Sequence, residues 1–387
     1  MTVYIMDGFE TYGDKTTAGA DVEANIDATD GNGDVTIDWF ASVSGVGHGG
    51  NVSLVDDHLA EGLALEFPPF DSARQEYITY FWPDGTGRFP DKIVSTNSSS
   101  PVWGCGFRFF NSDWTVSSGS PVNVFWYVMN GSTSAGANLR VQSDKTTLRF
   151  TDADSITYDA ASALTAGAWH YIEIEWKQTT IGGGGYAKIF VDGTLVIDTG
   201  TCDMSGFTFL TTHGFRIGVV NSGANQTGGS NYRFDDLYGM EIDGVEHTSL
   251  LGDSRVKLLK PNSDATPNDW TRSTGTDNFG RVDKQDWDTA EYVEADATGE
   301  DDHYGLETLG AVDTVHAIQV DAVVQAVDGT PTLHIGTDNG TADEADMGTI
   351  GTASPVQMRA LFNEDPSNAA WTQSSVNSVE ATQRMTE

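Results

Sequence analysis

The fold class is decided by two neighbouring stretches, His170-Tyr171-Ile172-Glu173-Ile174-Glu175-Trp176-Lys177 and Tyr186-Ala187-Lys188-Ile189-Phe190-Val191-Asp192-Gly193-Thr194-Leu195-Val196-Ile197-Asp198. In the first stretch, Ile172, Ile174 and Trp176 alternate with polar side chains, which predicts a strand with one face on a core and the other in water. In the second, Asp192-Gly193 separates two apolar runs and is a strong signal for a β-hairpin. Together they predict an antiparallel sheet.

Short apolar runs bounded by Gly, Ser, Asn and Asp recur along the chain, as expected of an all-β protein. The predicted strands of the first part are residues 77–82, 106–110, 123–128, 139–142, 148–151, 170–176, 187–191, 194–198, 215–220 and 232–238. The only helical pattern is weak, at residues 56–62. The later strands are predicted at residues 255–259, 315–327 and 331–335, and a loosely ordered end at residues 377–387.

The composition changes character near residues 244–261, where aromatic residues become sparser and acidic ones denser. We therefore expect residues 1–248 to form one β domain, and residues 249–387 a smaller β-rich domain.

The chain of 387 residues carries 57 acidic and 20 basic residues, a formal net charge of −37. Such a charge repels phosphate groups and anionic lipid surfaces, so neither nucleic acid nor a membrane is an expected partner. It suits solubility at high salt and the capture of cations. No apolar run reaches the roughly 20 residues of a membrane helix.

The two cysteines, Cys105 and Cys202, lie in no zinc-binding spacing, and we expect two buried thiols. The opening residues have neither a basic nor an apolar region of the kind found in secretory signals. These features predict synthesis in a reducing cytoplasm.

Asp30-Gly31-Asn32-Gly33-Asp34, followed by Asp38, spaces oxygen ligands as the first half of a calcium loop does. The glycine after Asp34 and the distal bidentate glutamate of a full calcium loop are missing. Asp30, Asn32, Asp34 and Asp38 thus form either a calcium site or a plain turn. No other cofactor is expected.

The pair Glu173 and Glu175 is the nearest approach to glycosidase chemistry, which needs two carboxylates flanking the scissile bond. Both glutamates share a strand face with Lys177, so we expect a solvated face with a local ion pair. The chain is therefore not expected to be an enzyme.

Aromatic residues cluster at residues 77–82 and 125–127, where packing into a core is the favoured interpretation. Trp103 and Trp114 stand in polar, loop-like surroundings and are the better candidates for an exposed sugar-stacking platform.

Several motifs occur in an order that resembles concanavalin A-like lectin and glucanase jelly rolls, including laminin G-like modules. They are Trp169-His170-Tyr171, Phe190-Val191-Asp192-Gly193, Phe215-Arg216-Ile217-Gly218 and Phe234-Asp235-Asp236-Leu237-Tyr238. The opening Met6-Asp7-Gly8-Phe9-Glu10-Thr11-Tyr12 is similar to the start of many structural proteins of tailed bacteriophages in this group. The later motifs, which resemble the C-terminal half of phage minor virion proteins, are Leu251-Gly252-Asp253-Ser254-Arg255-Val256, Asp269-Trp270-Thr271, residues 286–292, Asn363-Glu364-Asp365-Pro366 and Trp371-Thr372.

The resemblance implies a jelly-roll β-sandwich followed by the smaller domain, in a non-enzymatic structural protein of a tailed-phage virion. It would be a capsid decoration, a fibre or a tail-associated module. The alternatives are a carbohydrate-binding host-receptor module and a glucanase-like hydrolase. Laminin G-like modules use carboxylates near Asp235-Asp236 for calcium, whereas in phage relatives the pair would cap loop amides.

The expected partners are further copies of the chain, with a trimer as first choice, other virion proteins and possible host glycans. The C-terminal domain would be the attachment to the particle. The expected location is the virion, after synthesis in the host cytoplasm.

Overall fold

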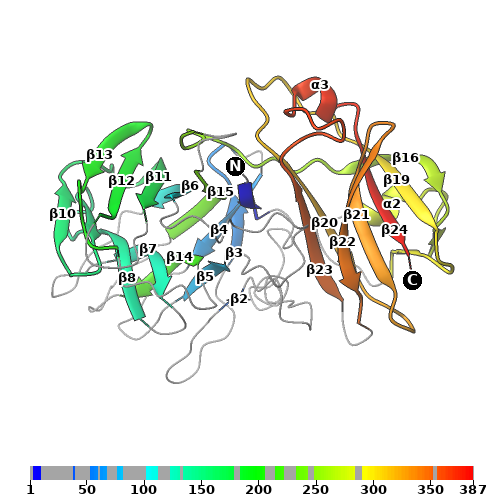
Figure 1. The fold of residues 1–387 in the computed structure, drawn as a ribbon, viewed down its shortest axis with the longest axis horizontal. Coiled ribbons are helices and arrows are strands. Elements are labelled where there is room, and N and C mark those ends of the chain that lie inside the picture. Colours follow the sequence, from blue (N-terminus) through cyan, green and yellow to red (C-terminus); the bar gives the residue numbers. More distant parts are fainter. Residues whose placement is uncertain are drawn as a thin grey trace.

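The structure is a computed structural model that describes residues 3–9, 38–39, 53–59, 62–67, 76–81, 102–111, 123–130, 134–177, 184–204, 214–221, 232–242, 248–283, 290–351 and 355–386. Nearly all of these residues lie in antiparallel strands or the turns between them. Figure 1 shows two β-rich bodies. We call residues 3–242 the first unit, residues 248–260 the connector and residues 261–386 the second unit.

The first unit is a jelly-roll β-sandwich, as the sequence predicts, and its larger sheet has eight strands. Along the sheet these strands are β13 (Thr194–Asp198), β12 (Tyr186–Val191), β11 (Ala168–Lys177), β6 (Val102–Asn111), β15 (Tyr232–Glu241), β4 (Leu63–Phe67) and β3 (Ser53–Asp56), with β1 (Val3–Asp7) also paired to β15. The Asp192-Gly193 turn between β12 and β13 has positive φ at both residues, 49° and 76°, as a type I′ hairpin requires.

The other sheet of the sandwich has seven strands and faces the first across a shared core. In spatial order they are β10 (Thr157–Ala160), β9 (Leu148–Thr151), β8 (Ser134–Val141), β7 (Asn123–Asn130), β14 (Gly214–Asn221), β5 (Glu76–Phe81) and β2 (Asp38–Trp39). Phe109 of β6 stacks on Phe125 of β7 with ring centroids 4.4 Å apart, which joins the two layers. Ile172, Ile174 and Trp176 lie in this core, so the predicted inward face of β11 is confirmed.

The second unit has its own apolar cluster and three small sheets. The five-stranded sheet runs β16 (Pro261–Asn268), β19 (Asp301–Leu306), β24 (Glu380–Met385), β21 (Thr332–Asp338) and β22 (Ala342–Thr349). The two-stranded sheets are β17 (Thr271–Arg272) with β18 (Val293–Glu294), and β20 (Ile318–Val324) with β23 (Val356–Phe362); the short helices are α2 (Phe279–Val282) and α3 (Gln373–Val376).

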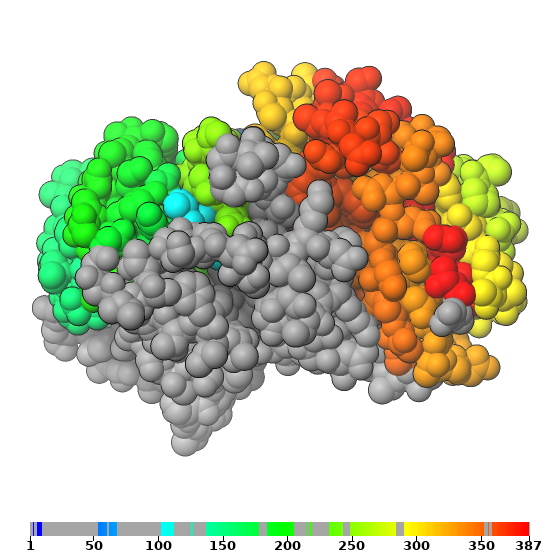
Figure 2. All heavy atoms as spheres, viewed as in Figure 1, coloured from blue at the N-terminus to red at the C-terminus, as the bar shows by residue number. Residues whose placement is uncertain are grey.

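Strand β1 lies where the two units meet, at the blue arrow near the N label of Figure 1. The backbone N–H of Val3 donates to Oδ1 of Asn363 at 2.8 Å, and Arg359 of β23 forms an ion pair with Asp7 at 3.5 Å. Figure 2 shows the same view in space-filling form, with the second unit in yellow to red on its right side. The short strand β1 thus belongs to the large sheet and also contacts the second unit.

Every strand predicted between residues 77 and 238 overlaps an observed one, and Cys105 and Cys202 are free and buried, as expected. Three predictions are wrong. The described residues of 56–62, namely 56–59 and 62, lie at the end of β3 and in a turn rather than in a helix, residues 255–259 do not form a strand, and the end of the chain contains β24, the middle strand of its sheet. The predicted boundary after residue 248 falls between β15 and β16, and the division into two domains stays a prediction. In the parts of the chain that are described, no helix is long and apolar enough to cross a membrane.

Candidate functional site

The connector lies over the middle of the outer face of the eight-stranded sheet, above β11, β6 and β15. On this face Tyr171 and Tyr238 are only 1% and 2% exposed, because Leu251 of the connector packs against them together with Met240. The backbone N–H of Leu251 also donates to the Tyr238 hydroxyl at 3.2 Å. The part of the face around Tyr171 and Tyr238 is therefore filled by the chain's own residues.

Glu173 is buried beneath the connector, which corrects the expectation of a solvated strand face. Its Oε1 accepts hydrogen bonds from the Tyr238 hydroxyl at 2.6 Å and from the N–H of Gly252 at 2.8 Å. Burial raises the pKa of Glu173, and these two hydrogen bonds only partly oppose the shift. Glu173 is thus held by two donors from its own chain.

Glu175 forms an ion pair with Lys188 of the neighbouring strand, not with Lys177, on which the expectation rested. Its Oε1 accepts from Lys188 Nζ at 2.9 Å and from the Tyr186 hydroxyl at 2.8 Å. Both carboxylates of the predicted pair therefore have partners on the sheet or connector.

Arg108 of β6 links the sheet to the connector. Its Nε donates to Oδ2 of Asp236 at 2.8 Å, and its Nη2 pairs with Asp253 of the connector. Oδ1 of Asp236 accepts from the backbone N–H of Val256 at 2.8 Å, so Asp236 caps a loop amide, one of the two roles considered for it. Burial raises the pKa of Asp236, although the Val256 amide and Arg108 favour its ionised form.

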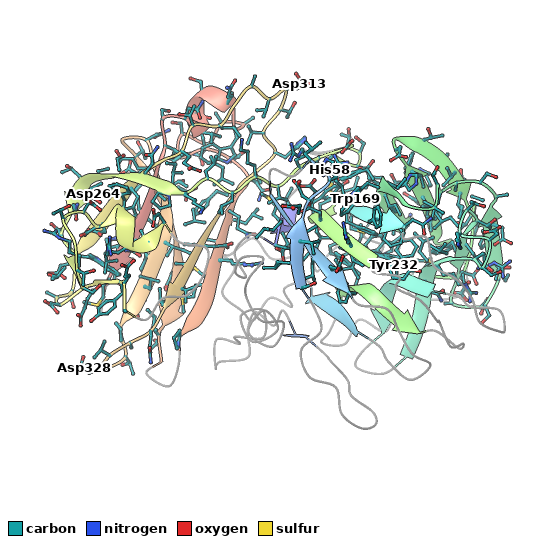
Figure 3. The ribbon with its side chains drawn as sticks, turned by 180° about the vertical axis from the view of Figure 1, so that it is seen from behind. His58, Trp169, Tyr232, Asp264, Asp313 and Asp328 are labelled. Atoms are coloured by element: carbon teal, nitrogen blue, oxygen red, sulfur yellow. The ribbon has the colours of Figure 1, made fainter. Side chains whose placement is uncertain are left out.

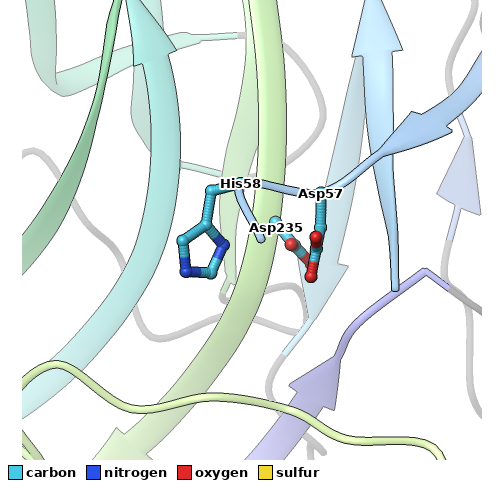
Figure 4. Close-up of side chains that lie close together, drawn as sticks. All are labelled: Asp57, His58 and Asp235. Carbon is cyan, nitrogen blue, oxygen red and sulfur yellow. The ribbon is translucent and has the colours of Figure 1, made fainter. Parts of the chain in front are cut away.

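Asp57, His58 and Asp235 form a compact group beside this network (Figure 4). Asp57 and His58 lie in the turn after β3, and Asp235 lies at an irregular point of β15 where its pairing with β6 shifts register. One ligand atom from each residue lies within 4.8 Å of the others. Among the described residues, this is the one such group of three His, Cys, Asp or Glu side chains.

The two carboxylates of this group are already oriented by local contacts. Oδ1 of Asp57 accepts from the N–H of Leu59 at 2.8 Å, and Oδ2 lies 3.4 Å from Nη2 of Arg255. Oδ1 of Asp235 accepts from the N–H of Asp236 at 2.8 Å. Hydrogen bonds of this kind fix the direction in which a carboxylate presents its remaining lone pairs.

The His58 ring is held by aromatic packing, and its Nδ1 atom is buried without a hydrogen-bond partner. The ring meets Trp169 edge-on with ring centroids 6.1 Å apart, and Trp169 in turn packs on Phe110 with centroids 5.5 Å apart. Figure 3 labels His58 and Trp169. Burial lowers the pKa of His58, and the charges of Arg108 and Arg255 act in the same direction. The ring is therefore neutral at pH 7, as a metal ligand must be.

The sequence analysis singled out Asp235 but neither Asp57 nor His58. No local signal marks them, since an Asp-His pair in a turn is common and its partner lies far along the chain.

The predicted platform residue Trp103 is only 4% exposed, so its proposed exposure is wrong. It lies in β6 and packs into the core, where its apolar ring is better accommodated than in water. Trp114 lies outside the described residues. So do Asp30, Asn32 and Asp34, while Asp38 is in β2 with its side chain undescribed; the calcium loop stays a prediction.

No protein-family model matches the chain, and no curated protein matches it. Among solved structures it is similar to alginate lyase Aly36B, with a TM-score of 0.38 and 13% identity over 62% of this chain and 96% of that chain. It is also similar to the cellulose-induced protein Cip1, with a TM-score of 0.35 and 15% identity over 61% of this chain and 97% of that one. For alginate lyase vAL-1 from Chlorella virus the TM-score is 0.33 at 13% identity, over 49% and 89%. Likenesses at this level assign neither activity nor ligand to this chain.

Proposed function

We propose that the chain is a non-enzymatic structural protein of a tailed-phage virion, a surface module of the capsid, fibre or tail. The observation that supports this best is the connector lying over the outer face of the eight-stranded sheet. A jelly-roll hydrolase needs two carboxylates that flank a bound sugar. Here Glu173 is 4% exposed and hydrogen-bonded to the connector, and Glu175 is paired with Lys188. The burial of Glu173 and the ion pair of Glu175 support a packing role for this part of the sheet.

The contacts of β1 support the same proposal. Val3 and Asp7 belong to the large sheet by strand pairing, yet they bind Asn363 and Arg359 of the second unit. A structural module must present one unit in a defined orientation while the other is attached to a particle. Because β1 contacts β15 in the first unit and Asn363 and Arg359 in the second, it helps to fix the orientation of one unit relative to the other.

The net charge of −37 bears on how copies would assemble. Free copies repel one another at low salt, so stable assembly requires apolar patches or partners of complementary charge. We infer a symmetric homo-oligomer, with a trimer as first choice and the second unit as the attachment to other virion proteins.

Sedimentation with purified capsids and tails of the encoding phage, together with light scattering, tests the proposal. Salt is raised from about 0.1 M to about 1 M, which shortens the Debye length from about 10 Å to about 3 Å. We expect co-sedimentation with particles and trimers in solution. A chain that stays monomeric at all salt concentrations and does not bind particles would contradict the proposal. Binding to host-surface glycans alone would favour the receptor-module alternative, and turnover of laminarin, agar or carrageenan oligosaccharides would favour the hydrolase.

A further inference from the structure

We propose that Asp57, His58 and Asp235 bind one divalent transition-metal ion of the zinc class, at the point where the connector meets the eight-stranded sheet. The proposal does not depend on the virion function. It rests on the geometry of the group, on the unpartnered nitrogen of His58, and on the charge around them.

The donor set determines the class of ion. Two carboxylate oxygens and one neutral imidazole nitrogen form a set that zinc accepts, at about 2.0–2.2 Å from each atom. Calcium and magnesium prefer sites made of oxygen atoms only. The three donor atoms lie within 4.8 Å of one another, so an ion placed between them reaches all three after small side-chain rotations.

His58 provides the observation that an acidic cluster alone would lack. A buried polar atom usually has a hydrogen-bond partner, because an unpaired one has lost its hydrogen bonds to water without replacement. Nδ1 of His58 is buried and has none. In Figure 4 the ring turns a nitrogen toward the carboxylates of Asp57 and Asp235, which is where an ion would lie. Packing against Trp169 keeps the ring in this orientation before any ion binds.

The surrounding charge also favours a cation. The carboxylates of Asp57, Asp235, Asp236 and Asp253 are accompanied by two guanidinium groups, those of Arg108 and Arg255. Four negative and two positive groups leave a formal charge of −2, which one divalent ion balances.

Bound metal would join two parts of the chain, next to the connector. Asp57 and His58 come from the turn after β3, and Asp235 comes from β15. The connector joins them through Arg255, which contacts Asp57, and through Asp253, which contacts Arg108. An ion bound only by the folded state should therefore raise the melting temperature of the first unit.

The experiment uses the full chain, stripped with chelator and dialysed. Zinc, cobalt, calcium or magnesium is then added, while bound metal is counted by mass spectrometry and melting is followed by calorimetry. We expect one equivalent of zinc or cobalt and a higher melting temperature, with no such effect of calcium or magnesium at this site. His58→Ala and Asp235→Asn should each weaken zinc binding at least tenfold and abolish the rise in melting temperature.

Three controls separate this site from other carboxylates and histidines. Asp154→Asn removes an exposed carboxylate beside Asp203, and His334→Gln removes a histidine that lies 4.0 Å from Glu344. The double variant Asp30→Ala, Asp34→Ala removes the calcium loop predicted from the sequence. All three should bind zinc as the unmodified chain does.

A second measurement applies if the His58 variant fails to fold. In the unmodified chain loaded with cobalt, ligation by an imidazole gives a strongly shifted, exchangeable ring N–H signal in the proton NMR spectrum. Absence of this signal would overturn the proposal. So would zinc binding that is unchanged in folded His58→Ala, or one-to-one binding of calcium but not zinc.

Discussion

The hydroxyl of Tyr238 on β15 donates a hydrogen bond to Oε1 of Glu173 on β11, with an O···O distance of 2.6 Å, across the intervening strand β6. Residue Gly106 of β6 lies opposite both residues in the strand register, so the Tyr238 ring passes over a position that has no side chain. The backbone N–H of Gly252, in the connector, donates a second hydrogen bond to the same Oε1 atom of Glu173. This relationship attaches the connector to the sheet.

We expect Glu173→Gln to become more stable relative to the unmodified chain as pH rises from about 4 to 7. Burial raises the pKa of Glu173 above its ordinary value of 4.5. Between the ordinary pKa and the raised pKa of the folded chain, the folded chain keeps a proton on Glu173 that the unfolded chain has lost. The free energy of unfolding of the unmodified chain therefore falls as pH rises. A glutamine side chain does not ionise in this pH range, so the variant does not lose stability in this way. Urea unfolding at several pH values measures the difference.

The control for this prediction is Glu175→Gln, which removes a carboxylate from the same face of β11 but leaves the Tyr238 contact intact. Its stability relative to the unmodified chain should not show the same rise. Parallel curves for Glu173→Gln and the unmodified chain would contradict the prediction.

Gly106→Ala should destabilise the first unit by about 1–3 kcal/mol, the usual cost of overpacking. A methyl group at this position would collide with the Tyr238 ring and lie 2.9 Å from the Tyr171 hydroxyl. Gly310→Ala is the matched control, because a methyl group there meets nothing within 4 Å. Thermal and urea unfolding of both variants measures the effect, and equal stabilities of the two would show that the sheet accommodates the methyl group.

The sequence could predict the sandwich because its strands alternate over a shared apolar core. Ile172, Ile174 and Trp176 recur at every second position, and this alternation alone assigns them to the core face of β11. Strand β24, with the sequence Glu-Ala-Thr-Gln-Arg-Met, offers no such pattern, because it is stabilised by two neighbouring strands and not by an apolar face of its own. Polarity does not explain every omission, because the apolar strands β4, in the eight-stranded sheet, and β23 also lie outside the predicted ranges.

The candidate site depends on contacts that a linear pattern cannot express. Trp103 looked exposed because it is flanked by Pro101, Val102 and Gly104, which resemble a loop. Gly104 is instead a strand position that lets Leu250 of the connector approach, since a methyl group there would lie 2.7 Å from the Leu250 side chain. Asp235, which lies near His58, is likewise next to a register shift in β15 that no linear pattern marks.

His303→Gln should remove a stabilisation that the unmodified chain has in mildly acidic solution. Burial alone would lower the pKa of His303, but the carboxylates of Glu380, 3.1 Å from Nδ1, and Asp301, 3.2 Å from Nε2, raise it above 6.5. Asp338 lies 4.0 Å from Nδ1 and has the same sign of charge. The stabilisation is fully present below pH 6.5 and is lost as pH rises through the raised value.

Denaturant unfolding between pH 6 and pH 9 checks this prediction. The stability advantage of the unmodified chain over His303→Gln should shrink steadily across that range. The control is His334→Gln, on β21, which leaves the three carboxylates around His303 in place and should keep the pH dependence of the unmodified chain. An advantage independent of pH would mean that His303 contributes by packing alone.

Arg359→Met should be the most damaging of these substitutions, with a loss of about 3–5 kcal/mol, because it removes the positive charge that Arg359 brings to the buried Asp7 and the partly buried Asp321. Arg359 is 11% exposed and lies between Asp7 of β1, at 3.5 Å, and Asp321 of β20, at 3.3 Å. Burial already raises the pKa of Asp321, and Arg359 is the main group opposing that shift. Arg272→Met, on the exposed strand β17, is the control and should change stability by no more than about 0.5 kcal/mol.

The same substitution should loosen β1 before the rest of the sheet, because Asp7 is the residue of β1 that Arg359 contacts. Hydrogen exchange at Val3–Asp7 should accelerate in Arg359→Met, while exchange in the middle of β6 and β11 stays slow. Adding Asp321→Asn to Arg359→Met removes the negative charge of Asp321, which has lost its contact with Arg359, and should restore part of the lost stability. Uniform acceleration of exchange, or no recovery in the double variant, would show that Arg359 acts through packing in the second unit and not through its two carboxylates.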